Sequence, residues 1–166
     1  EKNFDYIFFD EAGQISISKL IASSMSSKNI VMIGDHMQLP QPSTGNIEGE
    51  SSLSPIEYLL RDQNTISDDK GIFLSKTYRM HKNVCEFISN SFYERRLRSD
   101  STTQNQSILF DEREIPNGIY LINPEHSGFS VQNEIEVDYV KNIYNNLINK
   151  NWRDRDNKIT KISSND

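Results

Sequence analysis

The chain has very little cysteine and no long apolar run, and each absence excludes a class of protein. A single cysteine, Cys85, cannot form an internal disulfide, so nothing indicates an oxidising compartment. The three histidines, His36, His81 and His126, have no second ligand at the spacing of a metal site. No apolar run approaches the ~18 residues that a membrane span needs. We therefore expect an intracellular protein that does not enter a membrane.

The sequence also lacks the positive charge that is usual in a small nucleic-acid-binding module. Its 24 Asp and Glu residues outnumber its 18 Lys and Arg residues, which gives a formal net charge of −6. A nucleic-acid partner must therefore be argued from motifs and not from composition. The hydrophobic content of 35%, with 10% aromatic residues, is enough for a packed core, so wholesale disorder is not expected.

Residues 4–33 have the pattern of a strand, a helix and a second strand. Residues 4–9 are almost entirely apolar, which is typical of a strand buried on both faces. The pattern predicts an amphipathic helix over residues 15–25. Residues 30–33 form a second buried strand that Gly34 closes. Strand, helix and strand in so few residues predict a βαβ unit. The apolar positions at helical spacing are Ile17, Leu20, Ile21 and Met25.

A loop, a short helix and a polar linker follow. Residues 40–54 are rich in proline, glycine and serine, which predicts an irregular loop. Pro55 suits the first turn of a short helix that ends at Leu60. The polar stretch from Arg61 to Gly71 has almost no apolar residue and is the candidate domain linker.

Beyond the linker, the pattern again alternates strands with helices. Residues 72–74 and 119–122 are predicted strands. Polar residues 95–114 predict an exposed excursion, and the chain is polar from Asn149 onward. The order of elements is α/β, with sheets that are incomplete at both ends. One helix face is marked by Val84, Phe87, Ile88 and Phe92, and a second helix by Val140, Ile143, Tyr144, Leu147 and Ile148.

Two acids, Asp10 and Glu11, stand at the end of the first apolar strand. Nucleotide hydrolysis needs a carboxylate to hold Mg²⁺ and a group that orients or deprotonates the attacking water. The carboxyl edge of a parallel sheet is where such folds bind ligands. The same pair also suits a helix N-terminus, where acids complement the helix dipole. Taken alone, the pair leaves both interpretations open.

Two further polar clusters follow predicted strands. Gly34 to Pro40 reads Gly-Asp-His-Met-Gln-Leu-Pro, in which the amide of Gln38 can donate to a phosphate oxygen while accepting from a water. Thr77 to His81 reads Thr-Tyr-Arg-Met-His after the strand that opens the second half. Its Arg79 offers the planar fork that suits a phosphate, which lysine cannot match.

These clusters carry a resemblance to a known family. Asp10 to Gln14, Gly34 to Pro40 and Tyr78 to His81, in this order and spacing, resemble motifs II, III and IV of superfamily 1 helicases. The Tyr-Arg-Met-His form resembles the branch that contains the nonsense-mediated-decay RNA helicase and its DNA-processing relatives. The resemblance covers residues 4–97, and Asn133 to Glu136 resembles more loosely an Asn-x-x-Glu stretch early in the second motor lobe.

The resemblance implies two partial RecA-like P-loop NTPase lobes with parallel sheets. Residues 1–62 would be the C-terminal part of the first lobe, residues 63–70 the linker, and residues 71–166 the N-terminal part of the second lobe. No Gly-x-x-x-x-Gly-Lys-Ser/Thr occurs, so the phosphate-binding loop is absent from this sequence. The isolated chain is therefore expected neither to bind Mg-ATP tightly nor to hydrolyse it.

The family's roles carry over position by position. By the resemblance, Asp10 would hold Mg²⁺ through water and Glu11 would be the catalytic base. Gln38 would sense the γ-phosphate of ATP, and Arg79 would reach that phosphate from the second lobe. The remaining roles are the shaping of a coupling loop by Gly34 and Asp35, a link from the nucleotide to the nucleic-acid side by Gln14, and a nucleotide contact by Glu136.

The resemblance implies an ATP-dependent helicase or translocase that acts on single-stranded DNA or RNA and uses ATP and Mg²⁺. It would be cytoplasmic or nucleoid-associated, would work with the remainder of a longer parent chain, and could carry a fused nuclease domain. Two alternatives stay open. One is a nucleic-acid-dependent P-loop ATPase switch that unwinds nothing, and the other is a non-catalytic interaction fragment in which the acids cap helices.

Overall fold

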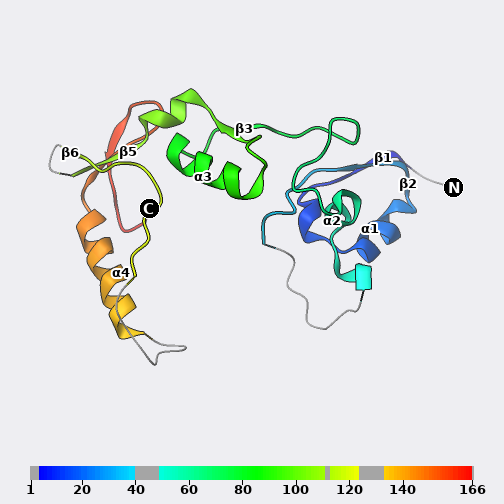
Figure 1. The fold of residues 1–166 in the computed structure, drawn as a ribbon, viewed down its shortest axis with the longest axis horizontal. Coiled ribbons are helices and arrows are strands. Elements are labelled where there is room, and N and C mark those ends of the chain that lie inside the picture. The colour runs from blue at the N-terminus through cyan, green and yellow to red at the C-terminus, as the bar shows by residue number, and fades with distance from the viewer. Residues whose placement is uncertain (1–3, 40–48, 111–112, 124–132, 166) are drawn as a thin grey trace. The chain divides into compact units, whose positions relative to one another are not determined.

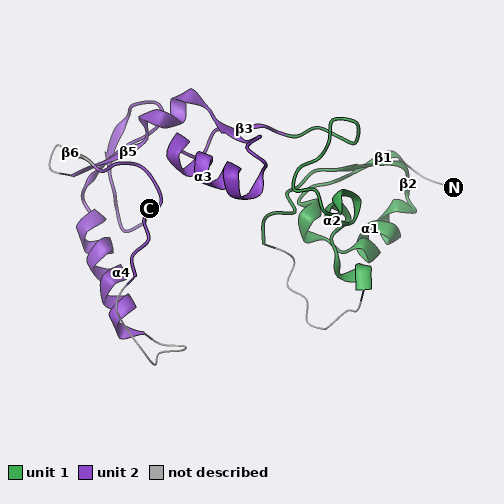
Figure 2. Cartoon of the chain, viewed as in Figure 1, with its two compact units in different colours: residues 1–73 green, residues 74–166 purple. Residues whose placement is uncertain are grey.

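The structure is a computed structural model, and it describes residues 4–39, 49–110, 113–123 and 133–165 (Figure 1). The chain forms two compact units, which divide between Phe73 and Leu74 (Figure 2). The polar stretch expected to link two domains therefore belongs to the first unit. Most of the loop expected at residues 40–54, together with His126, lies outside the described residues.

The first unit is built on a parallel pair of strands. β1 (Phe4–Phe9) and β2 (Ser27–Met32) are hydrogen-bonded in parallel, and α1 (Ile17–Ser24) connects them. The hydroxyl oxygen of Ser16 caps α1 by accepting a hydrogen bond from the backbone N–H of Lys19. The expected strand–helix–strand unit is therefore present.

β1 is not buried on both faces, contrary to the prediction from its composition. Phe4, Tyr6 and Phe8 share one face of the strand, and each side chain is at least 60% exposed. Ile7 and Phe9 point to the other face and are half-buried. A strand alternates its side chains between two faces, and no described element covers the aromatic face. An apolar run therefore predicted the strand but not how many of its faces are covered.

The buried stripe of α1 also differs from the one predicted. Ile17 and Leu20 are half-buried, whereas Ile21 and Met25 are 59% and 76% exposed. Ser24, which lies on the same line along the helix as Ile17 and Leu20, is half-buried as well. The orientation of the helix on β2 selects this line, and helical spacing alone does not distinguish it from its neighbour.

The short helix α2 has the predicted bounds, Pro55–Leu60. The hydroxyl of Ser54 accepts from the backbone N–H of Glu57 at 3.2 Å, and the carboxylate of Glu57 accepts from the backbone N–H of Ser54 at 2.7 Å. This reciprocal capping box satisfies two N–H groups at the start of the helix. Leu60 is only 5% exposed and anchors the other end.

The second unit contains another parallel strand pair. β3 (Lys76–Thr77) pairs with β4 (Arg98–Ser99), and α3 (Lys82–Phe92) connects them. Parallel strands joined by a helix thus occur in both units, as the predicted α/β class requires. The predicted apolar face of α3 is corrected in part, because Cys85 and Ser89 are buried while Phe87 and Phe92 are exposed.

An antiparallel sheet in the second unit was not predicted. Its strand order is β6–β5–β7–β8, and every pairing in it is antiparallel. Residues 95–114 are therefore not a simple exposed excursion, and the polar residues after Asn149 form a hairpin. β6, β7 and β8 have two or three residues each, too few to show an apolar alternation, and the apolar residues 108–110 of β5 lie inside the stretch predicted to be polar. The strands are β5 (Ser107–Phe110), β6 (Arg113–Glu114), β7 (Asn151–Arg153) and β8 (Ile159–Lys161).

The two strands predicted from apolar runs beyond residue 71 are wrong. Residues 72–74 and 119–122 pair with no described strand. Their side chains are largely exposed, with Leu74 at 76% and Leu121 at 92%. A strand needs a partner for its backbone N–H and C=O groups, and an apolar composition does not supply one.

The last helix, α4 (Glu134–Leu147), begins before the apolar positions that predicted it. The side-chain oxygen of Asn133 accepts from the backbone N–H groups of Ile135 and Glu136 and so caps the helix. The Asn-x-x-Glu stretch is therefore the first turn of α4 and does not precede it. No described helix is both long and apolar enough to cross a membrane.

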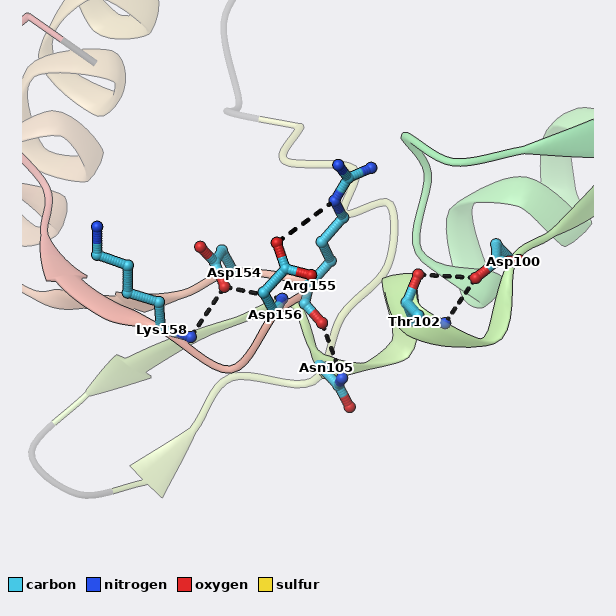
Figure 3. Close-up of polar contacts among 7 residues, drawn as sticks. All are labelled: Asp100, Thr102, Asn105, Asp154, Arg155, Asp156 and Lys158. Carbon is cyan, nitrogen blue, oxygen red and sulfur yellow. Dashed lines mark hydrogen bonds and ion pairs between the residues drawn. The ribbon is translucent and has the colours of Figure 1, made fainter.

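A half-buried arginine ties the β7–β8 hairpin to η3 (Ser101–Asn105), a 3-10 helix. The Nε of Arg153 donates to the carbonyl of Asn105 at 3.0 Å, and its Nη2 donates to the hydroxyl of Ser107 at 2.9 Å. In return, the amide of Asn105 donates to the carbonyl of Arg155 at 2.9 Å (Figure 3). These bonds connect segments that are far apart in the sequence.

We expect Arg153→Lys to loosen this connection, because the single ammonium nitrogen of lysine does not reproduce the spacing of the Nε and Nη2 donors of the guanidinium. Hydrogen bonds to a charged group contribute about 1.5–3 kcal/mol each, so losing one should speed amide exchange in β5 about tenfold or more. Hydrogen–deuterium exchange on the full-length protein measures this. Arg155→Lys makes the same chemical change at an exposed position and should leave β5 unchanged. Equal exchange in both variants would contradict the assigned role.

Candidate functional site

Asp10 and Glu11 form the turn that follows β1. Glu11 has a φ of 52°, in the left-handed region that is uncommon for residues other than glycine. Asp10 supports the turn, because its Oδ1 accepts a hydrogen bond from the backbone N–H of Glu11 at 3.0 Å. Both side chains are exposed. The two carboxylates therefore stand at the end of the strand and are accessible to a ligand.

Neither acid caps a helix with its side chain. The turn leads into η1 (Ala12–Gln14), a short 3-10 helix that has no side-chain cap. The next helix, α1, takes its cap from Ser16. Glu11 occupies the N-cap position of η1, so the pair does stand at a helix N-terminus, but no side-chain hydrogen bond supports a capping role.

The turn is hydrogen-bonded to the end of the neighbouring strand. The backbone N–H of Ile33 donates to the carbonyl of Phe9 at 2.8 Å, and the backbone N–H of Ala12 donates to the carbonyl of Ile33 at 2.9 Å. Ala12 is fully buried at this junction. The parallel ladder thus continues past β1 and β2 into the two segments that carry the sequence motifs.

The same two segments approach so closely that neither has room for a side chain at the contact. A Cβ placed on Gly13 would lie 2.5 Å from the carbonyl oxygen of Asp35. A Cβ placed on Gly34 would lie 2.6 Å from the backbone nitrogen of Ala12. The obstacle in both cases is backbone, which cannot move aside as a flexible side chain can. Glycine at both positions therefore sets the distance between the two motifs.

Asp35 organises the loop that follows β2. Its Oδ1 accepts from the backbone N–H of Met37 at 3.0 Å, and its Oδ2 accepts from the side-chain amide of Gln38 at 3.1 Å. Asp35 is half-buried, and Gln38 is exposed. One carboxylate therefore fixes both the bend of the loop and the orientation of the exposed amide.

Arg79 lies in the second unit, between β3 and α3. Its backbone N–H donates to the hydroxyl of Thr77 at 3.2 Å, and its side chain is exposed. On the helix side, the Nδ1 of His81 caps α3 by accepting from the backbone N–H of Asn83 at 3.2 Å. The side chain of Arg79 thus projects from a short turn whose two ends are both held by hydrogen bonds.

The structure gathers some of the predicted site residues and separates others. Gln14 ends η1, where its backbone N–H donates to the carbonyl of Glu11 at 2.8 Å. Glu136 is exposed in the first turn of α4, in the second unit with Arg79. Those that share the junction at the ends of β1 and β2 are Asp10, Glu11, Gln14, Gly34, Asp35 and Gln38. The sequence motifs contain Thr77 and Asn133 but predict no role for either. In the structure Thr77 accepts from the backbone N–H of Arg79, and Asn133 caps α4.

The donor set suits a magnesium ion that arrives with a nucleotide. The described residues hold no group of three or more histidine, cysteine or acidic side chains that could bind a metal unaided. Magnesium usually takes one or two carboxylates and completes its shell with waters and substrate phosphates. The exposed carboxylate of Asp10 meets that requirement, so the residues present fit this metal.

Comparison with known proteins identifies the family. The family model described as an AAA domain matches residues 52–165, which is more than half of the chain. The chain belongs to the AAA domain family. The AAA domain match includes Arg79 and Glu136 and begins after Asp10 and Glu11. No solved structure matches the chain.

Several relatives of the chain are named helicases. Helicase sen1 of Schizosaccharomyces pombe is 25% identical over 164 residues, which cover 89% of this chain and 9% of sen1. ATP-dependent helicase upf1 of the same yeast is 33% identical over 62% of the chain and 11% of its own length. The DNA replication ATP-dependent helicase/nuclease DNA2 of Gallus gallus is 33% identical over 61% of the chain and 10% of its own length.

These comparisons confirm the resemblance drawn from the three motifs. The chain is a superfamily 1 helicase sequence of the Upf1-like branch, with a mixed α/β fold that contains parallel strands. It spans 9–11% of the length of the three relatives named above.

We expect Gly34→Ala to destabilise the junction between the two motifs. The added methyl would collide with the backbone nitrogens of Ala12 and Gly13, and overpacking of this kind costs about 1–3 kcal/mol. Amide exchange at Ala12, whose N–H is bonded to Ile33, should therefore accelerate by about fivefold to a hundredfold. Gly118→Ala is the matched control, because a Cβ there would meet nothing within 4 Å. Unchanged exchange at Ala12 in Gly34→Ala would show that the contact is not tight.

Proposed function

We propose that this chain supplies the hydrolytic carboxylates, a γ-phosphate-sensing amide and a phosphate-contacting arginine to an ATP-dependent helicase. That helicase would couple hydrolysis to movement along one nucleic-acid strand. The observation that carries the proposal is the backbone junction between the Asp10–Gln14 and Gly34–Gln38 segments. It joins two motifs at the carboxyl ends of adjacent parallel strands, where α/β folds bind ligands.

The carboxylates divide the work of hydrolysis. Asp10 would hold Mg²⁺ through a water molecule, and the metal when bound would neutralise charge on the phosphate oxygens. Glu11 would take a proton from the attacking water. A general base must lie within reach of the proton that it removes, and the exposed carboxylate of Glu11 is accessible to a water. The left-handed backbone at Glu11 and the exposure of both side chains support these roles.

Gln38 would report the presence of the γ-phosphate to the rest of the unit. Its side-chain N–H group is held by Asp35, and the carbonyl of Asp35 lies against Gly13. A shift of Gln38 on nucleotide binding would therefore act on the turn that carries Glu11. Gln14, at the end of that turn, would pass the change to the nucleic-acid side.

Arg79 would contribute positive charge to the same phosphate. Charge spreads over the γ-phosphoryl oxygens in the transition state, and a planar guanidinium can donate to two of them at once. Because Arg79 lies on the other unit from Glu11, its approach would couple a conformational change to hydrolysis. Glu136 of the second unit would add a nucleotide contact.

The names of the relatives support the partners that we propose. Sen1 and upf1 are named helicases, and DNA2 is named a helicase/nuclease. We propose single-stranded DNA or RNA as the substrate, ATP and Mg²⁺ as the energy source, and a cytoplasmic or nucleoid-associated location. A nuclease domain in the same protein is an extension of the proposal. A strand-displacement assay separates a helicase from an ATPase switch that unwinds nothing.

In the full-length protein, Glu11→Gln should retain nucleotide binding and lose turnover. The amide keeps the shape of the carboxylate but cannot take a proton, and loss of general-base catalysis costs ~10²–10⁴-fold. Asp10→Ala should weaken Mg²⁺-dependent binding as well. Glu94→Gln is the matched control, because Glu94 is an exposed glutamate with a similar φ of 51°. Steady-state ATPase assays measure turnover, and nucleotide-binding assays measure affinity. Near-normal turnover in Glu11→Gln would exclude Glu11 as the general base.

Arg79→Lys should keep the charge yet lose most strand-stimulated ATPase activity. Arginine fingers contribute ~10³–10⁵-fold to rate in other phosphoryl-transfer enzymes, and a point ammonium does not reproduce the planar fork. Arg95→Lys, at another exposed arginine of the same unit, should have no such effect. An Arg79→Lys protein that binds nucleic acid and hydrolyses ATP at the unchanged rate would contradict the proposal.

A further inference from the structure

The residue two positions before Arg79 is bonded directly to the arginine's backbone. The hydroxyl oxygen of Thr77 accepts a hydrogen bond from the backbone N–H of Arg79 at 3.2 Å. Thr77 is the last residue of β3 and is half-buried, whereas Arg79 is exposed. The bond therefore runs from a fixed strand to the exposed turn that carries the guanidinium.

Thr77 is itself held by the neighbouring strand β4. The backbone N–H of Arg98 donates to the carbonyl of Ser75, and the backbone N–H of Asp100 donates to the carbonyl of Thr77, each at 2.8 Å. These two bonds lie on either side of Lys76, and the second one holds the carbonyl of Thr77 itself. The strand end cannot rotate without breaking at least one of them.

A charged contact reinforces the same place. The Nζ of Lys76 lies 3.3 Å from the carboxylate of Asp100, whose side chain is only 14% exposed, and 5.7 Å from the centre of the Tyr78 ring. Asp100 in turn accepts from the backbone N–H and the hydroxyl of Thr102 (Figure 3). These hydrogen bonds from Thr102, and the ammonium of Lys76, hold the pKa of Asp100 below its ordinary value. Lys76, the residue before Thr77, thus contacts both Asp100 and Tyr78, the residue after Thr77.

The other end of the turn is fixed by α3. His81 caps the helix, and the side-chain amide of Asn83 donates to the carbonyl of Asn117 at 2.7 Å. The side-chain amide of Asn117 donates onward to the carbonyl of Gln106 at 2.6 Å. Between β3 and the N-cap residue His81 only residues 78–80 remain to set the direction of Arg79, and the Thr77 hydroxyl accepts from the backbone N–H of the middle one.

We propose that Thr77 is a positioning residue, whose hydroxyl fixes the backbone of Arg79 and so sets where the guanidinium leaves the turn. This inference rests on the proposed role of Arg79 at the γ-phosphate. An arginine that must meet a phosphate in a bidentate geometry tolerates little displacement, and a misplacement of about 1 Å can cost ~10²-fold in rate. A hydroxyl that acts through Arg79 should affect turnover and leave ground-state binding unchanged.

Thr77→Val and Thr77→Ser make the test in the full-length protein. Valine keeps the β-branched shape that suits a strand and removes only the hydroxyl, whereas serine keeps the hydroxyl. We expect Thr77→Val to lower the kcat of strand-stimulated ATPase about tenfold or more, with KM for ATP and Kd for single-stranded nucleic acid unchanged within twofold. Thr77→Ser should restore kcat to within about threefold of the unsubstituted protein.

Thr160→Val is the control, since it removes a threonine hydroxyl from the exposed strand β8 of the same unit and should change nothing. If Thr77→Val fails to fold, Thr77→Ala replaces it in the same comparison with serine. A kcat for Thr77→Val within twofold of normal would overturn the inference. So would a serine variant as impaired as the valine variant.

A double substitution separates this inference from the proposed function. If Thr77 acts through Arg79, Thr77→Val should cost nothing further in an Arg79→Lys background, whereas a general structural role would still cost its full factor. A persistent tenfold loss in that background would overturn positioning. If Arg79→Lys alone leaves turnover unchanged, the proposed role of Arg79 fails. If Arg79→Lys is impaired while Thr77→Val is normal, only the positioning inference fails.

Discussion

The first unit depends on a close approach of two backbones just beyond β1 and β2. The carbonyl of Asp35 stands against Gly13, and the nitrogen of Ala12 against Gly34, with no side chain between them. Because the contact is made by backbone, it holds the two segments at a fixed separation whatever the neighbouring side chains do. The exposed Glu11 and Gln38 are carried by segments that meet at this point. Their relative placement is thus a consequence of glycine, which has no Cβ atom, at positions 13 and 34.

Hydrogen bonds of small polar side chains connect many of the other segments of the two units. Among the described residues, few with apolar side chains are buried: Ala12, Pro55, Leu60 and Cys85. Several hydroxyls are buried instead, and each is bonded: Ser27 to the carbonyl of Asn29, Thr103 to the carbonyl of Asp100, and Ser107 to Arg153. Such a bond contributes only about 0.5–1.5 kcal/mol net, but leaving a buried polar group unpaired costs more. The hydroxyls therefore specify which segments meet more than they add stability.

The exposed candidate residues Gln38 and Arg79 are held in a similar way in the two units. Gln38 is oriented by the carboxylate of Asp35, and the backbone of Arg79 is held by the hydroxyl of Thr77. In each case a half-buried residue at or just beyond the end of a parallel strand holds the exposed group within three positions of itself. The strand supplies rigidity and the polar side chain supplies direction. Both arrangements leave the candidate group itself accessible to a ligand.

The sequence by itself determined the family, the α/β class and the residues of the three motifs, because each motif is a short contiguous run whose side-chain chemistry is legible without coordinates. It also determined α2, whose cap and first-turn proline are local signals. Only the tertiary structure decided that residues 119–122 pair with no described strand, that residues after Asn149 form a hairpin, and that the aromatic face of β1 is exposed. Only the tertiary structure showed that the hydroxyl of Thr77 accepts from the backbone N–H of Arg79 and that the carbonyl of Thr77 accepts from the backbone N–H of Asp100. Strand pairing and burial join residues far apart in the chain, and a local pattern of apolar and polar residues does not say which distant segment will satisfy a given backbone or cover a given face.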